Sequence, residues 1–293
     1  MQGLWMLVAS LCFATMGVFI KLSSSYSATL GDIIFFRGLV PALGIAMWAW
    51  CSGRSLKSPV ARLHMRRNVF GICAMWLGFY ATTQLPLATA VTLMYTSPLF
   101  IAVILRFFYK QTSNRVETVA ITLGFLGVIA VLQPVFDSDD LWVALGGLAG
   151  GAIAALAYLQ LRNLGKMEEP EWRTVLYFAG SATVSGLAVS AVFGQTPMWT
   201  SEPFSLGVLC LIGVGLFGGA GNLALTRSFG SGSTWLSASL QYTTILVSTL
   251  YGIWVFGNIP SQIAWVGVIL ITACGTLSSF ATHQKTKQAP RAG

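Results

Sequence analysis

The side chains that could bind a small molecule in this chain are mostly uncharged, and they occur inside long apolar runs. Trp76 and Tyr80 are four residues apart, so they share one face of a helix. Gln241 belongs to a stripe of polar residues with helical spacing that begins at Ser237. The predicted substrate-binding residues are Trp76, Tyr80, Tyr95, Tyr158, Asn222, Ser237, Gln241, Tyr242 and Thr244.

A structural role is the alternative for each of these residues. Ser and Thr side chains join neighbouring helices in membranes, and aromatic rings fill cores or form interfacial belts. A buried amide such as that of Gln241 or Asn222 needs hydrogen-bonding partners, which a water-filled cavity supplies. A neutral polar cavity with aromatic walls would suit a small zwitterion or an amphipathic neutral solute.

Acid–base and metal chemistry have few candidate residues. The chain holds 9 Asp and Glu residues and 2 His residues. No acidic residue falls near the middle of an apolar run, and both His64 and His283 lie in segments predicted to be outside the membrane. We therefore expect no catalytic residue, no metal site and no cofactor, which argues against a membrane enzyme.

Buried charges are also expected to be rare. Arg37 is assigned near the outer end of the second apolar run, where it could pair with Asp32 or Lys21, and Arg67 is assigned to a loop. Strongly anionic substrates would need Lys or Arg pairs in the middle of the membrane. The sequence indicates no such pair and so disfavours these substrates.

The composition is that of a membrane protein. Only 9% of the 293 residues are charged and 55% are hydrophobic, whereas a soluble domain has about 25% charged residues. Of the 17 Lys and Arg residues, all but Lys21 and Arg37 gather in short loops and the C-terminal tail, which argues against nucleic acid as a partner. The expected partners are a small-molecule substrate and the lipid bilayer, and a monomer is one of the oligomeric states left open.

Ten apolar runs are long enough to cross a membrane, which takes about 20 residues. They cover approximately residues 4–22, 31–52, 67–84, 88–108, 116–133, 141–161, 172–193, 205–228, 233–256 and 261–281. Such long, unbroken runs predict helices and not barrel strands. Because most Lys and Arg residues lie in alternate loops and in the C-terminal tail, we expect both termini to be cytoplasmic, in a multi-pass protein of the inner membrane.

The chain contains an internal repeat. The pattern Leu-x-Tyr-Thr-[Ser/Thr]-x-Leu occurs at residues 93–99 and again at 240–246, an offset of 147 residues. This predicts two five-helix repeats, 1–135 and 136–282, followed by a basic tail, 283–293. Because five is odd, the second repeat must be inverted, and inverted repeats are typical of transporters with a binding site between the repeats.

These stretches resemble the EamA-type branch of the drug/metabolite transporter superfamily. The resemblance rests on residues 85–90 and 95–98 in the first half and on residues 237–242, 257–260 and 267–270 in the second. The family often has an acidic residue where Asn258 stands and usually a proline where Ile245 stands. The resemblance implies an all-α integral membrane fold of ten helices in two inverted repeats, a basket whose central cavity is walled by the third, fourth, eighth and ninth helices.

The predicted function is that of a secondary transporter exporting small neutral metabolites by alternating access. The resemblance implies amino acids, including aromatic ones, as substrates. Pro98 should bend the fourth helix and serve as a hinge, while the second repeat would need another source of flexibility, such as the glycines of the eighth run. A proton-coupled multidrug exporter and a non-transporting scaffold are the alternatives; the first run lacks the membrane-embedded Glu of small multidrug exporters.

Overall fold

The computed structural model describes residues 2–107, 140–194, 198–201, 205–230, 237, 240–270 and short pieces between 119 and 130 and between 272 and 277. All regular structure within these ranges is helical. The helices are α1 (Gln2–Ser25), α2 (Leu30–Cys51), α3 (Ala61–Gln84), α4 (Leu87–Met94), α5 (Ser97–Phe107), α7 (Leu141–Lys166), α8 (Glu171–Val192), α9 (Met198–Ser201), α10 (Leu206–Gly230) and α12 (Thr243–Phe256).

Five of these helices are long and apolar enough to span a membrane, namely α1, α2, α7, α8 and α10. The stretch 87–101 and α12 are apolar but shorter, and α3 is as long as the spanning helices but carries cations in its first turns. The predicted all-α membrane fold is therefore confirmed. Most of the predicted run 116–133 and the last part of the run 261–281 lie outside the described residues, while residues 262–270 are also helical.

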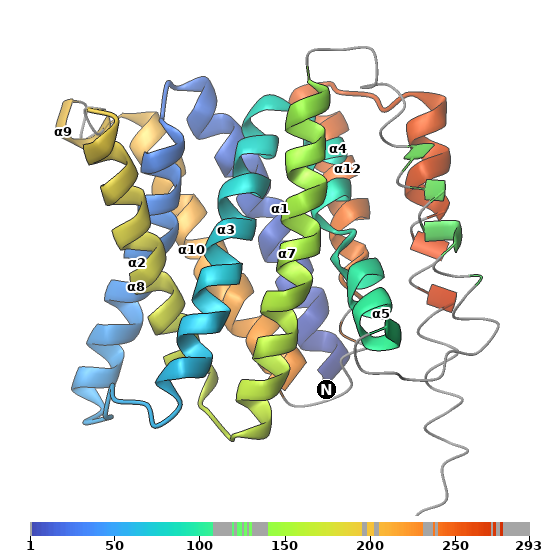
Figure 1. Ribbon diagram of the computed structural model, residues 1–293. Helices are drawn as coiled ribbons and strands as arrows, with labels where there is room; N and C mark the ends of the chain where they lie inside the picture. The colour runs from blue at the N-terminus through green and yellow to red at the C-terminus, as the bar shows by residue number, and fades with distance from the viewer. Residues whose placement is uncertain are drawn as a thin grey trace, which may run out of the picture.

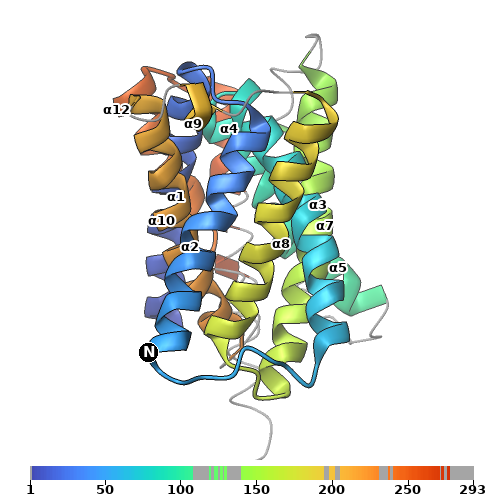
Figure 2. The same ribbon diagram turned by 90° about the vertical axis from the view of Figure 1, so that its left-hand side faces the viewer.

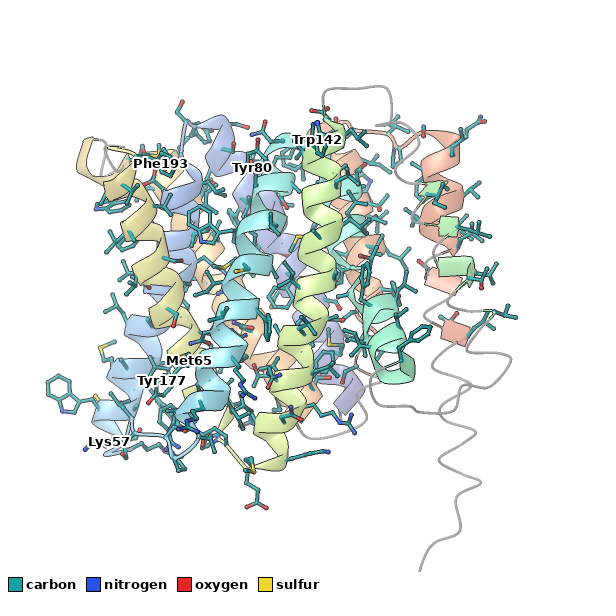
Figure 3. All side chains as sticks on the ribbon, in the orientation of Figure 1. Lys57, Met65, Tyr80, Trp142, Tyr177 and Phe193 are labelled. Atoms are coloured by element: carbon teal, nitrogen blue, oxygen red, sulfur yellow. The ribbon has the colours of Figure 1, made fainter. Side chains whose placement is uncertain are left out.

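Corresponding helices of the two halves run in opposite directions. In Figure 1 the N-terminus marks the start of α1 at the bottom of the molecule. Helix α7 begins at the top, where Figure 3 labels Trp142, and runs downwards. This inversion is what an odd number of helices in each repeat predicts.

Helix packing follows the same pseudo-twofold relation. Helix α1 packs mainly on α10, and α7, which corresponds to α1, packs on α3, which corresponds to α10. Helices α2 and α8 correspond to one another and pack together; Figure 2 shows them side by side. The boundaries predicted at residues 135 and 282 lie outside the described residues and stay predictions.

Most of the described cations gather at the end of the molecule where α1 begins. This cation-rich end contains the loop between α2 and α3, the last turns of α7 and α10 and the first turn of α8, and Figure 3 labels Lys57 there. Its Lys and Arg residues are Arg54, Lys57, Arg62, Arg66, Arg162, Lys166, Arg173 and Arg227. The asymmetry predicted from the sequence is therefore present in space.

The predicted pairing of Asp32 is wrong. Its carboxylate caps α2 by accepting hydrogen bonds from the backbone N–H and the hydroxyl of Thr29, at 3.0 and 2.9 Å. The Thr29 hydroxyl in turn accepts a hydrogen bond from the Asp32 N–H, which completes a capping box. Lys21 donates to the Leu85 carbonyl at 2.7 Å, so neither Lys21 nor Asp32 neutralises Arg37.

The fourth helix is broken near its middle, as the position of Pro98 predicts. Helix α4 ends at Met94 and α5 begins at Ser97, with Pro98 in the first turn of α5, where the missing N–H of proline costs little. Gly151 of α7 lies against this break, because an added Cβ would come within 2.6 Å of the Thr96 hydroxyl oxygen. The break is therefore packed closely against the second repeat.

The second repeat has a matching break without a proline. Gln241 and Tyr242 are in a turn and α12 begins at Thr243, which is 147 residues after Thr96. The N–H of Ile245 donates to the Tyr242 carbonyl at 3.0 Å, a bond of the short turn type. The glycines of α10 let this helix pack closely on α1 and α2, and their role as a source of flexibility stays a prediction.

Candidate functional site

A cavity of about 120 Å³ lies between the two halves of the molecule. Residues from eight elements line it, and examples are Phe13 of α1, Arg37 of α2, Phe79 of α3, Tyr158 of α7 and Phe178 of α8. The third, fourth, eighth and ninth helices contribute, as expected. The sixth helix contributes Tyr158, which is one of the predicted binding residues. The first, second and seventh helices also contribute, which the sequence did not indicate.

Two buried arginines line this cavity. Arg37 and Arg67 are only 3% and 4% exposed. Arg37 is seven residues into α2, or about 10 Å from the start of the helix, and Arg67 is about 9 Å into α3. Since α2 and α3 start from opposite ends of the molecule, both guanidinium groups reach toward its middle. The expectation that no arginine pair lies there is wrong.

A ring from the other repeat lies beside both guanidinium groups. The central carbon of Arg67 is 3.6 Å from the centroid of the Phe178 ring, and that of Arg37 is 6.0 Å from the same centroid. Arg67 also donates from Nη2 to Oδ1 of Asn222 on α10, at 3.4 Å. The two arginines therefore belong to the first repeat, and their neighbours Phe178 and Asn222 belong to the second.

Neither arginine has a counter-ion among the described residues. The ion pairs within the described ranges involve Glu169, at the cation-rich end. Nε and Nη1 of both Arg37 and Arg67 are buried without a hydrogen-bond partner, and so is Nδ2 of Asn222. Because guanidinium keeps its proton at any physiological pH, this part of the site is positively charged.

Apolar side chains form the rest of the wall. Phe13 and Met16 come from α1, while Met75 and Phe79 come from α3. Met75, Phe79 and Thr82 have the spacing i, i+4, i+7, so they form one face of α3. The cavity thus combines fixed positive charge with aromatic and thioether surface.

Four of the predicted binding residues line the cavity, namely Tyr95, Tyr158, Asn222 and Thr244. They add hydroxyl and amide groups next to the arginines. The side chain of Gln241 is fully buried, neither of its amide atoms has a hydrogen-bond partner among the described residues, and it does not line the cavity. The binding roles of all five stay predictions.

The other predicted residues lie elsewhere. Tyr80 is 46% exposed, and Trp76 is partly buried against a neighbouring core cluster; the cavity-facing pair on α3 is Met75 and Phe79, one position earlier. Ser237 hydrogen-bonds to Ser228 of α10, Tyr242 is a core residue, and Pro98 is buried at the helix break. The described lining of this cavity does not include Trp76, Tyr80, Ser237 or Tyr242, and their binding roles stay predictions, as does the hinge role of Pro98.

The residues that the sequence reasoning missed are Arg37, Arg67, Phe178 and Phe79. The apolar pattern places the start of the third run at Arg67 and groups this residue with the cations of the preceding loop, yet α3 begins at Ala61 and carries Arg67 almost two turns inside. Counting depth from the capping box at Thr29 would have placed Arg37 about 10 Å inside α2.

A second buried polar group, the Glu169 cluster, consists of Ser58, His64, Glu169 and Arg173 at the cation-rich end. Oε1 of Glu169 is 3.2 Å from Nε2 of His64 and accepts a hydrogen bond from Nη1 of Arg173 at 3.0 Å. Nε2 of His64 is also 3.1 Å from the Ser58 hydroxyl, and the His64 ring stacks on Tyr177 at 4.6 Å. Figure 3 labels Tyr177 on this part of α8.

The charges of the Glu169 cluster stabilise each other. Burial alone would raise the pKa of Glu169, but hydrogen bonds from Ser58, Arg173 and His64 and the charge of Arg173 together lower it. Burial is the largest influence on His64 and lowers its pKa, against the opposing effect of Glu169. The cluster links α3 of the first repeat to the start of α8 in the second.

Comparison with known proteins agrees with this architecture. Residues 2–133 match the EamA-like transporter family, which confirms the resemblance seen in the sequence. The pseudopaline exporter CntI of Pseudomonas aeruginosa is 27% identical over 278 residues, covering 92% of this chain and 93% of the relative. A transporter of Helicobacter pylori is 25% identical, covering 92% of each chain.

A crystal structure supports the fold. It aligns with a TM-score of 0.71 at 16% sequence identity, covering 95% of this chain and 98% of the other. At that sequence identity the match supports the fold and says nothing about the substrate.

Proposed function

Starting from its place among the EamA-like transporters, we propose that this protein exports small metabolites, amino acids including aromatic ones among them, from the cytoplasm by alternating access. The observation that carries this proposal is the central cavity, whose wall combines charged, polar and aromatic side chains from both halves. A purely structural scaffold has no need of such a cavity. The relative named as an exporter supports the outward direction.

Access would alternate by movement of one repeat against the other. The Glu169 cluster joins the repeats at the cation-rich end, with Tyr177 donating to the Leu56 carbonyl at 3.1 Å and Asn68 donating to Ser181 at 2.9 Å. These contacts close one side of the cavity and must separate when that side opens. The excess of positive charge favours the cytoplasm for this end, in the inner membrane.

The charge of the cavity argues against the multidrug alternative. A proton-coupled exporter of organic cations needs a carboxylate that both substrate and proton can occupy. No Asp or Glu is among the described residues that line this cavity, while two arginines are. An organic cation would meet like charge there, so amino acids, which carry a carboxylate, are the better supported candidates.

Counterflow into reconstituted vesicles tests the function. Vesicles that contain the protein and unlabelled phenylalanine should take up labelled phenylalanine faster than protein-free vesicles do. A panel of other amino acids, sugars and organic cations, each with and without a proton gradient, would define the range of substrates. Uptake equal to that of empty vesicles across the whole panel would contradict the proposal.

The matched variants Phe79→Ala and Tyr80→Ala test where the site lies. Phe79 lines the cavity and Tyr80, one position further, faces away from it. We expect Phe79→Ala to slow counterflow and Tyr80→Ala to leave it close to wild type. The reverse result would mean that the Trp76–Tyr80 face of α3, and not the Met75–Phe79 face, binds the substrate.

A further inference from the structure

We propose that Arg37 and Arg67 together form an anion-binding site for substrates with two carboxylate groups and an adjoining apolar part. The proposal deepens the proposed function, because it names the class of substrate that the same cavity takes. It rests on three features of the arginine pair: unpartnered donors, positive charge without a counter-ion among the described residues, and the space and aromatic neighbour that hold the guanidinium groups.

The first feature is the kind of polar atom left unsatisfied. Nε and Nη1 of Arg37, Nε and Nη1 of Arg67 and Nδ2 of Asn222 are all hydrogen-bond donors without a partner. A carboxylate accepts hydrogen bonds only, and it matches the planar guanidinium group in shape. Donors of this kind lining a cavity therefore call for a ligand with a carboxylate and disfavour a ligand whose only charged group is an amine.

The second feature is the charge. Two guanidinium groups without a counter-ion among the described residues leave the cavity with two positive charges. Taking unpaired charges out of water is unfavourable, so the two charges destabilise the empty site. One carboxylate would neutralise half of this charge, and two carboxylates would neutralise all of it. This favours a dicarboxylate over a singly charged acid.

The third feature is how the structure holds the two side chains. A Cβ at Gly218 of α10 would collide with the Arg37 guanidinium group, and one at Gly71 of α3 would lie 3.2 Å from Nη1 of Arg67. The central carbons of both groups lie over the Phe178 ring, at 3.6 Å from its centroid for Arg67 and 6.0 Å for Arg37. An arginine that packs its face on a ring still has its N–H groups free to donate at its edge.

The apolar wall suits the remainder of the ligand. Phe13, Met75 and Phe79 lie on the same cavity as the arginine pair. A ligand with carboxylates at one end and a ring or alkyl group at the other would bury both parts favourably. Benzylsuccinate has this form, and phenylpropionate and phenethylamine have the same ring with one carboxylate and with one amine.

Thermal stability of the purified protein in detergent tests binding separately from transport. Benzylsuccinate should raise the melting temperature most, phenylpropionate less, and phenethylamine not at all. Arg37→Gln and Arg67→Gln should each weaken benzylsuccinate binding about tenfold or more. Arg66→Gln removes an exposed neighbouring cation and should leave binding unchanged.

Asn222→Asp provides a variant that does not depend on removing an arginine. The new carboxylate would stand next to Nη2 of Arg67, where Oδ1 of Asn222 now lies. It should raise the melting temperature of the free protein and weaken benzylsuccinate binding, because it occupies one guanidinium group from within the chain.

The outcomes separate the two proposals. Stabilisation by benzylsuccinate that depends on both arginines, without counterflow of any solute, would support the anion site and contradict the transport function. Counterflow that is unaffected by the Arg37 and Arg67 substitutions, or equal stabilisation by phenethylamine, would overturn the anion site and leave the transport function standing.

Discussion

The Glu169 cluster and the arginine pair are both groups of buried charged side chains, yet their surroundings differ. In the Glu169 cluster the carboxylate accepts from Arg173 and is paired with His64, so opposite charges meet within hydrogen-bonding distance. In the arginine pair two like charges share a cavity, and their described neighbours are a ring and an amide. Both groups bring the two repeats into contact.

The difference indicates what each group is for. A buried charge that is paired inside the protein costs little and holds its elements together, whereas a buried charge without a partner keeps its full cost of desolvation until a ligand arrives. The Glu169 cluster therefore stabilises one arrangement of the repeats. The two guanidinium groups of the arginine pair have no counter-ion among the described residues, and an acidic substrate could neutralise them.

Glu169→Gln should have the largest effect on stability. It leaves Arg173 and His64 without the carboxylate between them, and we expect a loss of about 2 kcal/mol in the free energy of unfolding. Thermal or denaturant unfolding in detergent would measure it. Glu168→Gln is the matched control, because that neighbouring side chain is exposed. Arg67→Gln should not lower the free energy of unfolding in the same way. Equal losses in Glu169→Gln and Arg67→Gln would contradict the proposed difference between the Glu169 cluster and the arginine pair.

Gly218→Ala should displace the guanidinium group of Arg37 without changing any charge. Overpacking at such a position costs about 1–3 kcal/mol, and we expect the rate of counterflow to fall about tenfold. Gly180→Ala in α8 is the control, because a Cβ there meets nothing within 4 Å. A fully active Gly218→Ala protein would mean that the position of Arg37 does not matter for transport.

Phe178→Leu should weaken the arginine pair more mildly. It removes the ring beside both guanidinium groups, a contact worth about 1 kcal/mol, which corresponds to roughly a fivefold loss of affinity for an acidic substrate. Ligand-dependent shifts in melting temperature would measure the loss. Phe193→Leu changes an exposed ring at the opposite end of α8 and should have no such effect; similar losses in the two variants would count against a specific role of Phe178.

The pH dependence of the melting temperature should distinguish the Glu169 cluster from the arginine pair, and it is the smallest of the expected effects. The folded protein lowers the pKa of His64 below its ordinary value of 6.5, so the fold favours neutral His64. The stability gained this way is complete above pH 6.5 and decreases as the pH falls through the lowered pKa. Melting temperatures should therefore drop on acidification in wild type and drop less in His64→Gln. An identical pH response in both proteins would exclude His64 as the cause.

Much of the fold could be predicted from the sequence because lipid imposes strict rules. Long apolar runs must be helices, and alternate cationic loops set the orientation of each helix. The offset of 147 residues predicted the inversion that α1 and α7 display, and Pro98 predicted the break in the fourth helix. These inferences depend on chain properties that no neighbouring helix can alter.

The site was harder to predict because it depends on how far each residue lies from the start of its helix and on which face of the helix it occupies. An error of six residues at the start of α3 turned Arg67 from a cavity residue into a loop residue. An error of one residue, about 100° of rotation, exchanged the Met75–Phe79 face for the Trp76–Tyr80 face. The partners of Asp32 and Arg37 come from capping and from other helices, which spacing along one helix cannot reveal.

The matching breaks at Tyr95–Thr96 and Gln241–Tyr242 have a thermodynamic consequence under the proposed mechanism. If each half can bend at the same point, the inward-open and outward-open shapes arise from the same two bends exchanged between halves, so their energies are nearly equal. The concentration gradient of the solute then decides which way net flow goes. Pro98, whose equivalent in the other half is Ile245, makes the two halves unequal and would bias the resting population toward one side.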